Sequence, residues 1–127
     1  MKITSFLLFL LLGLASSVSS CKKDKIYTIL GNWVGTYNNG PADYYFALNI
    51  KSGGTLDMMD NAANKSQITA TGTWTVVNGV FTTIVDYGSG TNASFTAPFN
   101  SKSATLTGTW GTTPSTTDGG TWTMTKQ

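Results

Sequence analysis

The chain has 127 residues, of which 40% are hydrophobic and only 11% are charged. Eight lysines face six aspartates, the formal net charge is +2, and histidine, arginine and glutamate are absent. This near-neutral balance argues against a nucleic-acid partner, and the missing histidine removes the commonest general base and metal ligand. We therefore expect no enzymatic activity, no metal site and no cofactor. The surface must consist mainly of Thr, Ser, Asn and Gly, which suits strands and turns.

The first twenty residues are patterned like a secretory signal peptide. Lys2 gives a positive start, residues 6–14 form an apolar run, and residues 15–20 are small. The apolar run is shorter than the ~20 residues that a membrane-spanning helix needs, and an uncleaved anchor helix is the alternative interpretation. We expect residues 1–20 to be removed before Cys21.

Cys21 is the only cysteine, so it cannot form an intramolecular disulfide. The sequence Val18-Ser19-Ser20-Cys21 resembles the lipobox of bacterial lipoproteins, although Val18 and Ser20 stand where Leu and Gly or Ala are usual. The resemblance implies lipidation of Cys21, with acyl chains such as palmitate, whereas ordinary cleavage nearby is the alternative. Two or three acyl chains suffice for stable anchoring. We expect anchoring to a membrane of the bacterial cell envelope, the outer membrane.

The lysine-rich segment after the cysteine predicts a tether. Residues 22–25 read Lys-Lys-Asp-Lys, and we interpret residues 21–28 as a solvated spacer. The alternative is a sorting signal for the outer face of the cell, although such signals are usually acidic. The remaining residues, 29–127, are typical of one domain.

From position 29 onward, eight short runs of β-forming residues alternate with turn sequences, and no run shows helical periodicity. This pattern predicts an all-β fold, an eight-stranded antiparallel up-and-down β-barrel. The expected strands are residues 30–37, 43–50, 55–59, 68–77, 80–87, 93–99, 104–110 and 121–126.

Asn78-Gly79 predicts the register of one hairpin. This dipeptide between two strand-like runs favours a two-residue type I′ turn. One face of the hairpin then turns apolar residues inward and the other exposes threonines, with apolar exceptions at positions 77, 80 and 84. The expected cross-strand pairs are Val77 with Val80, Val76 with Phe81, Trp74 with Thr83 and Gly72 with Val85.

Every tryptophan follows a glycine by two residues, at positions 31/33, 72/74, 108/110 and 120/122. Residues two apart on a strand share a face, so each indole is expected to have an empty neighbour. Glycine within a strand also permits the bending that closes a small barrel. We interpret the repeat as a packing device, and ligand contact by the tryptophans is the alternative.

Gly31-Asn32-Trp33 at the start of the first expected strand, followed by eight strands in up-and-down order, resembles the lipocalins and the wider calycin group. The chain is most similar, over residues 30–126, to small bacterial lipoproteins with a lipocalin-like domain. Their Gly-Thr-Trp, Leu-Thr-Gly-Thr-Trp-Gly and Gly-Thr-Trp-Thr-Met motifs are all present. The resemblance implies a structural signature of Gly31, Trp33 and Lys126, in which the lysine packs across the indole at the closed end.

Eight-stranded barrels either fill with side chains or hold one small ligand, and the sequence leaves both open. If the end with the termini is closed, residues 38–42, 60–67, 88–92 and 111–119 form the open rim. Asp57 and Asp60 match no calcium-loop spacing and are typical of a polar turn.

Three functions remain open. The first is binding of a small apolar or amphipathic ligand, and the others are protein binding or hydrolase inhibition by the rim loops, and a passive envelope role. We expect a monomer whose partners are the membrane, through Cys21, and a small apolar ligand. The candidate ligand-binding residues are Tyr37, Tyr44, Phe46, Met58 and Phe95.

Overall fold

The computed structural model describes residues 24–127, so the predicted signal peptide, Cys21 and the start of the tether lie outside the described residues. No helix in this range is long and apolar enough to cross a membrane. Within the same range the strands are β1 (Gly31–Asn39), β2 (Ala42–Lys51), β3 (Thr55–Met59), β4 (Ala70–Val77), β5 (Val80–Asp86), β6 (Asn92–Pro98), β7 (Thr105–Thr112) and β8 (Gly120–Lys126).

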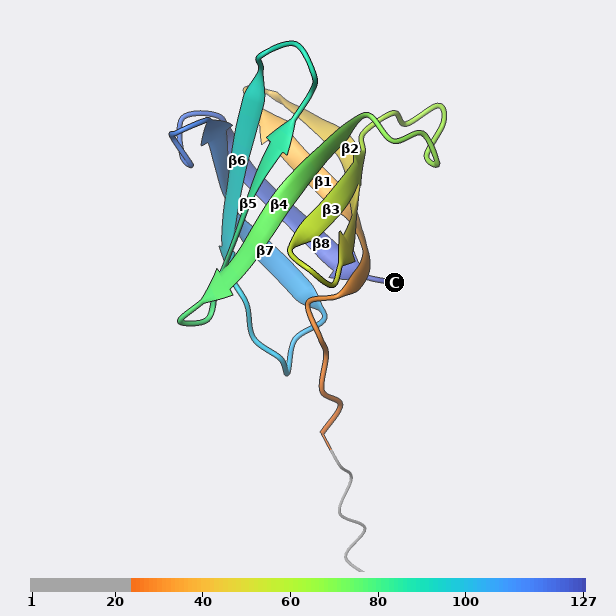
Figure 1. Ribbon diagram of the computed structural model, residues 1–127, viewed down its shortest axis with the longest axis vertical. Coiled ribbons are helices and arrows are strands. Elements are labelled where there is room, and N and C mark those ends of the chain that lie inside the picture. Colours follow the sequence, from red (N-terminus) through yellow and green to blue (C-terminus); the bar gives the residue numbers. More distant parts are fainter. Residues whose placement is uncertain (1–23) are drawn as a thin grey trace, which may run out of the picture.

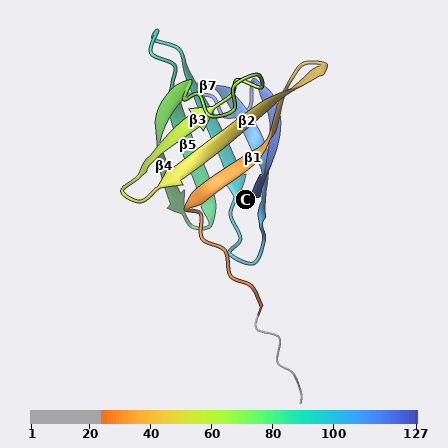
Figure 2. The ribbon, with the colours of Figure 1, turned by 90° about the vertical axis from the view of Figure 1, so that its right-hand side faces the viewer.

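The sheet closes into a barrel. Each strand pairs antiparallel with the next, and β8 pairs with β1 (Figure 1 and Figure 2). The closing pair runs from Trp33 opposite Lys126 to Tyr37 opposite Trp122. This architecture confirms the predicted all-β, eight-stranded up-and-down barrel. Because every strand has a partner on both sides, the wall is complete within the described chain.

The hairpin of β4 and β5 has the predicted register. Asn78 and Gly79 have φ angles of 52° and 74°, as a type I′ turn requires. Val77 lies opposite Val80, and the three other expected pairs are also present. The alternation is confirmed as well, since Phe81 and Val85 are fully buried while the threonines of β4 are exposed.

Strand ends differ from the expected ones by one or two residues. β4 begins at Ala70 rather than at position 68, because Ile68 is 55% exposed and the Thr69 hydroxyl accepts a hydrogen bond from the Asp60 N–H. That bond holds Thr69 in the loop. β7 continues past the expected end to Thr112, which pairs with Ala93. Glycine at position 111 therefore lies within the strand and does not end it.

Aromatic side chains fill the centre of the barrel. Phe46 stacks on Phe95 with ring centroids 5.4 Å apart, and Trp122 meets both rings edge-on at 6.0 and 5.9 Å. None of the three is more than 2% exposed. Burial of each large apolar side chain contributes about 1.5–3 kcal/mol, so this stack is a main source of stability. Around it pack Leu48, Ile50, Leu56, Phe81, Val85, Leu106 and Met124.

Three of the glycines that precede the tryptophans allow the backbones of neighbouring strands to approach closely. A Cβ on Gly72 would lie 2.4 Å from the Ile84 carbonyl oxygen, and one on Gly108 would lie 1.8 Å from that of Thr96. A Cβ on Gly120 would lie 2.5 Å from the carbonyl oxygen of Asn38. The nearest obstacle is therefore backbone of another strand. At Gly31 the nearest atom is instead the Lys126 Cε, at 3.6 Å. Close approach of strands thus explains glycine at three of the four positions, and the bending role stays a prediction.

The end with the termini is plugged by Trp33, which is fully buried. Its Nε1–H donates to the Ile29 carbonyl at 2.8 Å, and Lys126 Nζ lies 5.6 Å from the ring centroid. Lys126 also donates to the carbonyls of Thr28 and Leu30. This is the closed-end contact that the lipocalin resemblance implies, made here by lysine. The incoming chain is thereby fixed across the end of the barrel.

Candidate functional site

The open rim lies opposite the termini, at the top of Figure 1. Residues 40–41, 60–69, 87–91 and 113–119 form its four connections, close to the positions predicted from the sequence. Loops carried by a rigid scaffold are the usual place for function.

The five predicted ligand-binding residues separate into two groups. Phe46 and Met58 expose no surface and Phe95 exposes 2%, so these three belong to the core. A side chain that borders a void large enough for water exposes area to it, and these three leave no such room. Tyr37 and Tyr44 instead lie at the rim, where Tyr44 is 46% exposed. Only this pair is available to a ligand.

An aromatic surface covers the core at the open end. The register places Tyr37 opposite Tyr44, and their rings stack with centroids 5.4 Å apart. Trp110 meets Tyr37 edge-on at 5.4 Å, and its Nε1–H donates to the Asn38 carbonyl at 2.8 Å. The backbone bond fixes the indole, so the three rings form a preformed, partly exposed surface.

Tyr87 and Asp60 complete this group. The Tyr87 hydroxyl donates to Met58 Sδ at 3.4 Å. Burial raises the pKa of Tyr87 well above its usual range, and the Asp60 carboxylate and Tyr37 raise it further. Burial, Asp60 and Tyr44 likewise raise the pKa of Tyr37. Asp60 therefore acts on both phenols, and we call Tyr37, Tyr44, Tyr87, Trp110 and Asp60 the rim cluster.

These shifts predict a loss of stability in alkali. The fold holds the phenols of Tyr37 and Tyr87 neutral, whereas the unfolded chain ionises them near pH 10. Stability is therefore fully present below about pH 10 and falls as the pH rises further. Urea unfolding at a series of pH values measures this fall. Tyr87→Phe should make it shallower, and Tyr45→Phe on the outer wall should not; equal slopes for the two variants would contradict the interpretation.

Asp60 differs from the other acidic residues of the open end. Asp86 accepts a hydrogen bond from a loop N–H and Asp118 accepts one from the last N–H of β7, each at 2.7 Å, and Asp43 accepts one from the Asn38 amide at 3.2 Å. These three carboxylates stabilise turns. Between residues 24 and 127, no hydrogen bond or ion pair engages the Asp60 carboxylate. Asp60 is thus a partly buried negative charge available to a ligand.

No family model, curated protein or solved structure matches the chain. Its function is therefore inferred from the geometry of residues 24–127. The closed eight-stranded barrel is compatible with a lipocalin-like fold, and fold likeness alone does not define a ligand. In the described range, no three His, Cys, Asp or Glu side chains are placed to hold a metal ion. Asp57 instead forms an ion pair with Lys51 at 3.0 Å.

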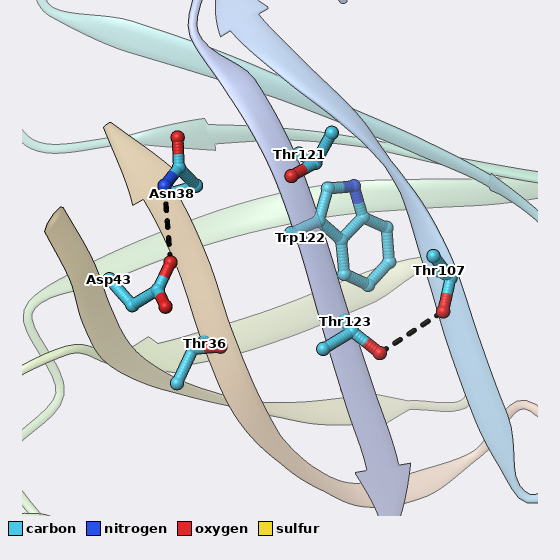
Figure 3. A pocket seen from close by; sticks show the side chains of 7 residues that line it. All are labelled: Thr36, Asn38, Asp43, Thr107, Thr121, Trp122 and Thr123. Carbon is cyan, nitrogen blue, oxygen red and sulfur yellow. Dashed lines mark hydrogen bonds between the residues drawn. The ribbon is translucent and has the colours of Figure 1, made fainter. Parts of the chain in front are cut away.

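A depression on the outer wall was missed by the sequence reasoning. It has a volume of about 280 Å³ and spans β1, β2, β7 and β8 (Figure 3). Its hydroxyls are partly satisfied by one another, since Thr107 and Thr123 are hydrogen-bonded at 3.0 Å. Trp122 contributes little because it is 2% exposed. The groove offers neither an apolar floor nor an unpaired charge. Its lining residues are Thr36, Asn38, Asp43, Thr107, Thr121, Trp122 and Thr123.

Proposed function

We propose that this chain is a membrane-anchored lipoprotein of the bacterial envelope whose barrel binds a small amphipathic ligand at its open rim. The observation that carries the proposal is the rim cluster, in which stacked aromatic rings lie near enough to the Asp60 carboxylate for it to raise the pKa of Tyr37 and Tyr87. Within the described residues that carboxylate has no hydrogen-bond or ion-pair partner. Aromatic faces and a carboxylate together favour a cationic group, such as a quaternary or primary ammonium. The apolar part of the ligand would cover Tyr44 and Trp110.

The filled core favours this form of ligand binding over uptake into the barrel. Phe46, Met58 and Phe95 are buried against other side chains, so a wholly apolar ligand would have to displace them. Overpacking a close-packed core costs typically ~1–3 kcal/mol or more. A ligand lying across the rim meets no such cost, because Tyr44 is already exposed.

The anchored location is supported by the sequence and by the path of the chain. The lipobox-like pattern at Cys21 supports acylation. The Tyr27 N–H donates to the Ser101 carbonyl at 2.6 Å at the closed end. The six Cα–Cα steps from Cys21 to Tyr27 span at most ~22 Å. Anchoring at Cys21 would thus keep the closed end near the membrane and the rim on the far side.

A second candidate function is protein binding by the rim loops. The observation that favours it is the long connection of residues 60–69, whose side chains from 62 to 68 are all exposed. A partner protein would contact these loops and Tyr44 together. The absence of any ligand in cell extracts, with recovery of one partner on the tethered protein, would favour this function over the first.

Decyltrimethylammonium, kept below its micelle concentration, is a suitable probe for the cationic site. We expect it to shift the indole N–H signal of Trp110 in NMR titrations and to leave that of Trp33 at the other end unchanged. Decyl sulfate, with the same tail and opposite charge, should bind more weakly because of Asp60. Asp60→Asn removes the ion-pair partner and leaves the rings in place, a loss of about 1 kcal/mol, so it should weaken binding roughly fivefold.

The matched control is Asp43→Asn, which removes a carboxylate from the outer wall of the same end. It should leave the affinity for decyltrimethylammonium within about twofold. Tyr44→Ala should weaken both detergents, because both tails lie on the ring. Equal binding of the two detergents, or equal effects of the two aspartate variants, would overturn the cationic site.

A further inference from the structure

The two ends of the barrel carry opposite charge. The open end holds four aspartates, at positions 43, 60, 86 and 118, and one lysine, Lys65. The closed end holds four lysines, at positions 25, 51, 102 and 126, with Asp24 on the incoming chain and Asp57 paired to Lys51. Three of these lysines are exposed, and the Lys126 ammonium donates hydrogen bonds to two backbone carbonyls. The barrel is thus basic toward its termini and acidic toward its rim.

The same closed end exposes apolar side chains on the outer wall. Val77 is 60% exposed and Val80 42% exposed, whereas the three other outward positions of β4 are threonines. They are cross-strand partners at the tip of the hairpin, and Val80 also pairs with the exposed Pro98 of β6. Ile26 on the incoming chain is 77% exposed. No other part of the described chain buries these side chains.

The hairpin and the incoming chain reach the same side of the molecule. In Figure 1 and Figure 2 the tip of β4–β5, the loop between β6 and β7 and the N-terminal segment all extend from one end. Lys102 lies in that loop. Two more lysines, at positions 22 and 23, precede the described range in the sequence. Basic and apolar residues are therefore combined where the chain leads to Cys21.

We propose that the closed end is a docking face for an anionic lipid surface, on which the lysines meet headgroups and the valine pair meets the acyl boundary. Anionic membranes attract clustered lysines, and apolar side chains at the tip add affinity. The inference extends the proposed anchoring: the acyl chains would hold the protein at the membrane, and the docking face would fix its orientation. The rim cluster would then point away from the bilayer.

The magnitude of the effect follows from the number of exposed lysines. Each lysine near an anionic surface strengthens binding about fivefold. Lys51 is left out because Asp57 pairs with it at 3.0 Å, so Lys25 and Lys102 together predict a preference of about 25-fold over neutral lipid. Salt should weaken it, since the attraction acts within a Debye length of ~10 Å.

The test uses the mature chain with Cys21→Ser, which cannot be acylated, so that docking is measured separately from anchoring. Flotation with phosphatidylcholine vesicles, with and without phosphatidylglycerol, gives the partition coefficient. We expect strong partition only with phosphatidylglycerol. Lys102→Gln should lower it about fivefold, and the matched variant Lys65→Gln at the open end should leave it unchanged. Both lysines are exposed on loops, so neither variant affects the core.

The apolar contribution has its own matched pair. Val77→Ser should lower partition to anionic vesicles severalfold, whereas Ile68→Ser, which removes a side chain of similar exposure at the open end, should not. Equal binding to both vesicle types, no binding to either, or equal effects within either matched pair would overturn the docking face. Because the chain tested is unacylated, these results are independent of whether Cys21 carries lipid.

Discussion

Cys21→Ser is expected to move the protein from the membrane fraction to the soluble fraction of the envelope once the membranes are washed at high salt, which screens the attraction between lysines and anionic lipid. Two or three acyl chains contribute ~0.8 kcal/mol for each buried methylene, far more than a docking face of a few lysines. The full precursor, expressed in a bacterium, should incorporate labelled palmitate, and the variant should incorporate none. Fractionation and the mass of the mature protein measure both effects.

Ser20→Ala is the matched control, because it brings the sequence before the cysteine closer to the usual lipobox. It should leave labelling and membrane location unchanged. A wild-type protein that keeps residues 1–20 and incorporates no palmitate would show that the apolar run is an anchor helix. A soluble wild-type protein would show ordinary cleavage and would refute lipidation.

Gly35→Ala is expected to abolish or severely weaken folding. Gly35 lies in β1 where the barrel closes on β8, and an added Cβ would lie 1.8 Å from the Thr123 carbonyl oxygen and 2.8 Å from Met124 Cα. Both atoms are backbone, so the methyl group can be accommodated only if β8 moves away. Losses above ~4 kcal/mol arise from such backbone disruption, and a domain has only ~5–15 kcal/mol of stability. Urea unfolding measures the difference.

Gly40→Ala separates this effect from a general cost of replacing glycine. Gly40 has a φ angle of 68° and would place its Cβ in open space, so only backbone strain of ~1–2 kcal/mol is expected. Comparable losses for the two variants would show that close approach of β1 and β8 is not the reason for glycine at position 35.

Local sequence signals were sufficient for most of the fold. Asn78-Gly79 determined a turn type, and the turn determined the register of β4 and β5 residue by residue. Alternation of threonine with apolar residues then defined the inner face of β4. Strand ends were less certain, because hydrogen bonds from loop side chains such as Thr69 determine where a strand begins.

The rim cluster could be predicted only in part. Tyr37 and Tyr44 were expected at a ligand site, but Phe46, Met58 and Phe95 share their face and differ only in depth. The depth of a side chain inside the barrel depends on how far neighbouring strands are shifted along one another. Alternation within a single strand does not specify that shift. Asp60 and Trp110 were missed as binding residues for a related reason, since they come from separate connections and strands and meet only when the barrel closes.

Closure of β1 on β8 has a consequence for many copies held on one surface. Tethering concentrates proteins in two dimensions, and a sheet with an unpaired edge would then be prone to strand-by-strand aggregation. Here every strand of the described barrel is paired on both sides, so crowded copies have no unpaired strand edge through which their backbones could hydrogen-bond. The fold is therefore suited to dense display.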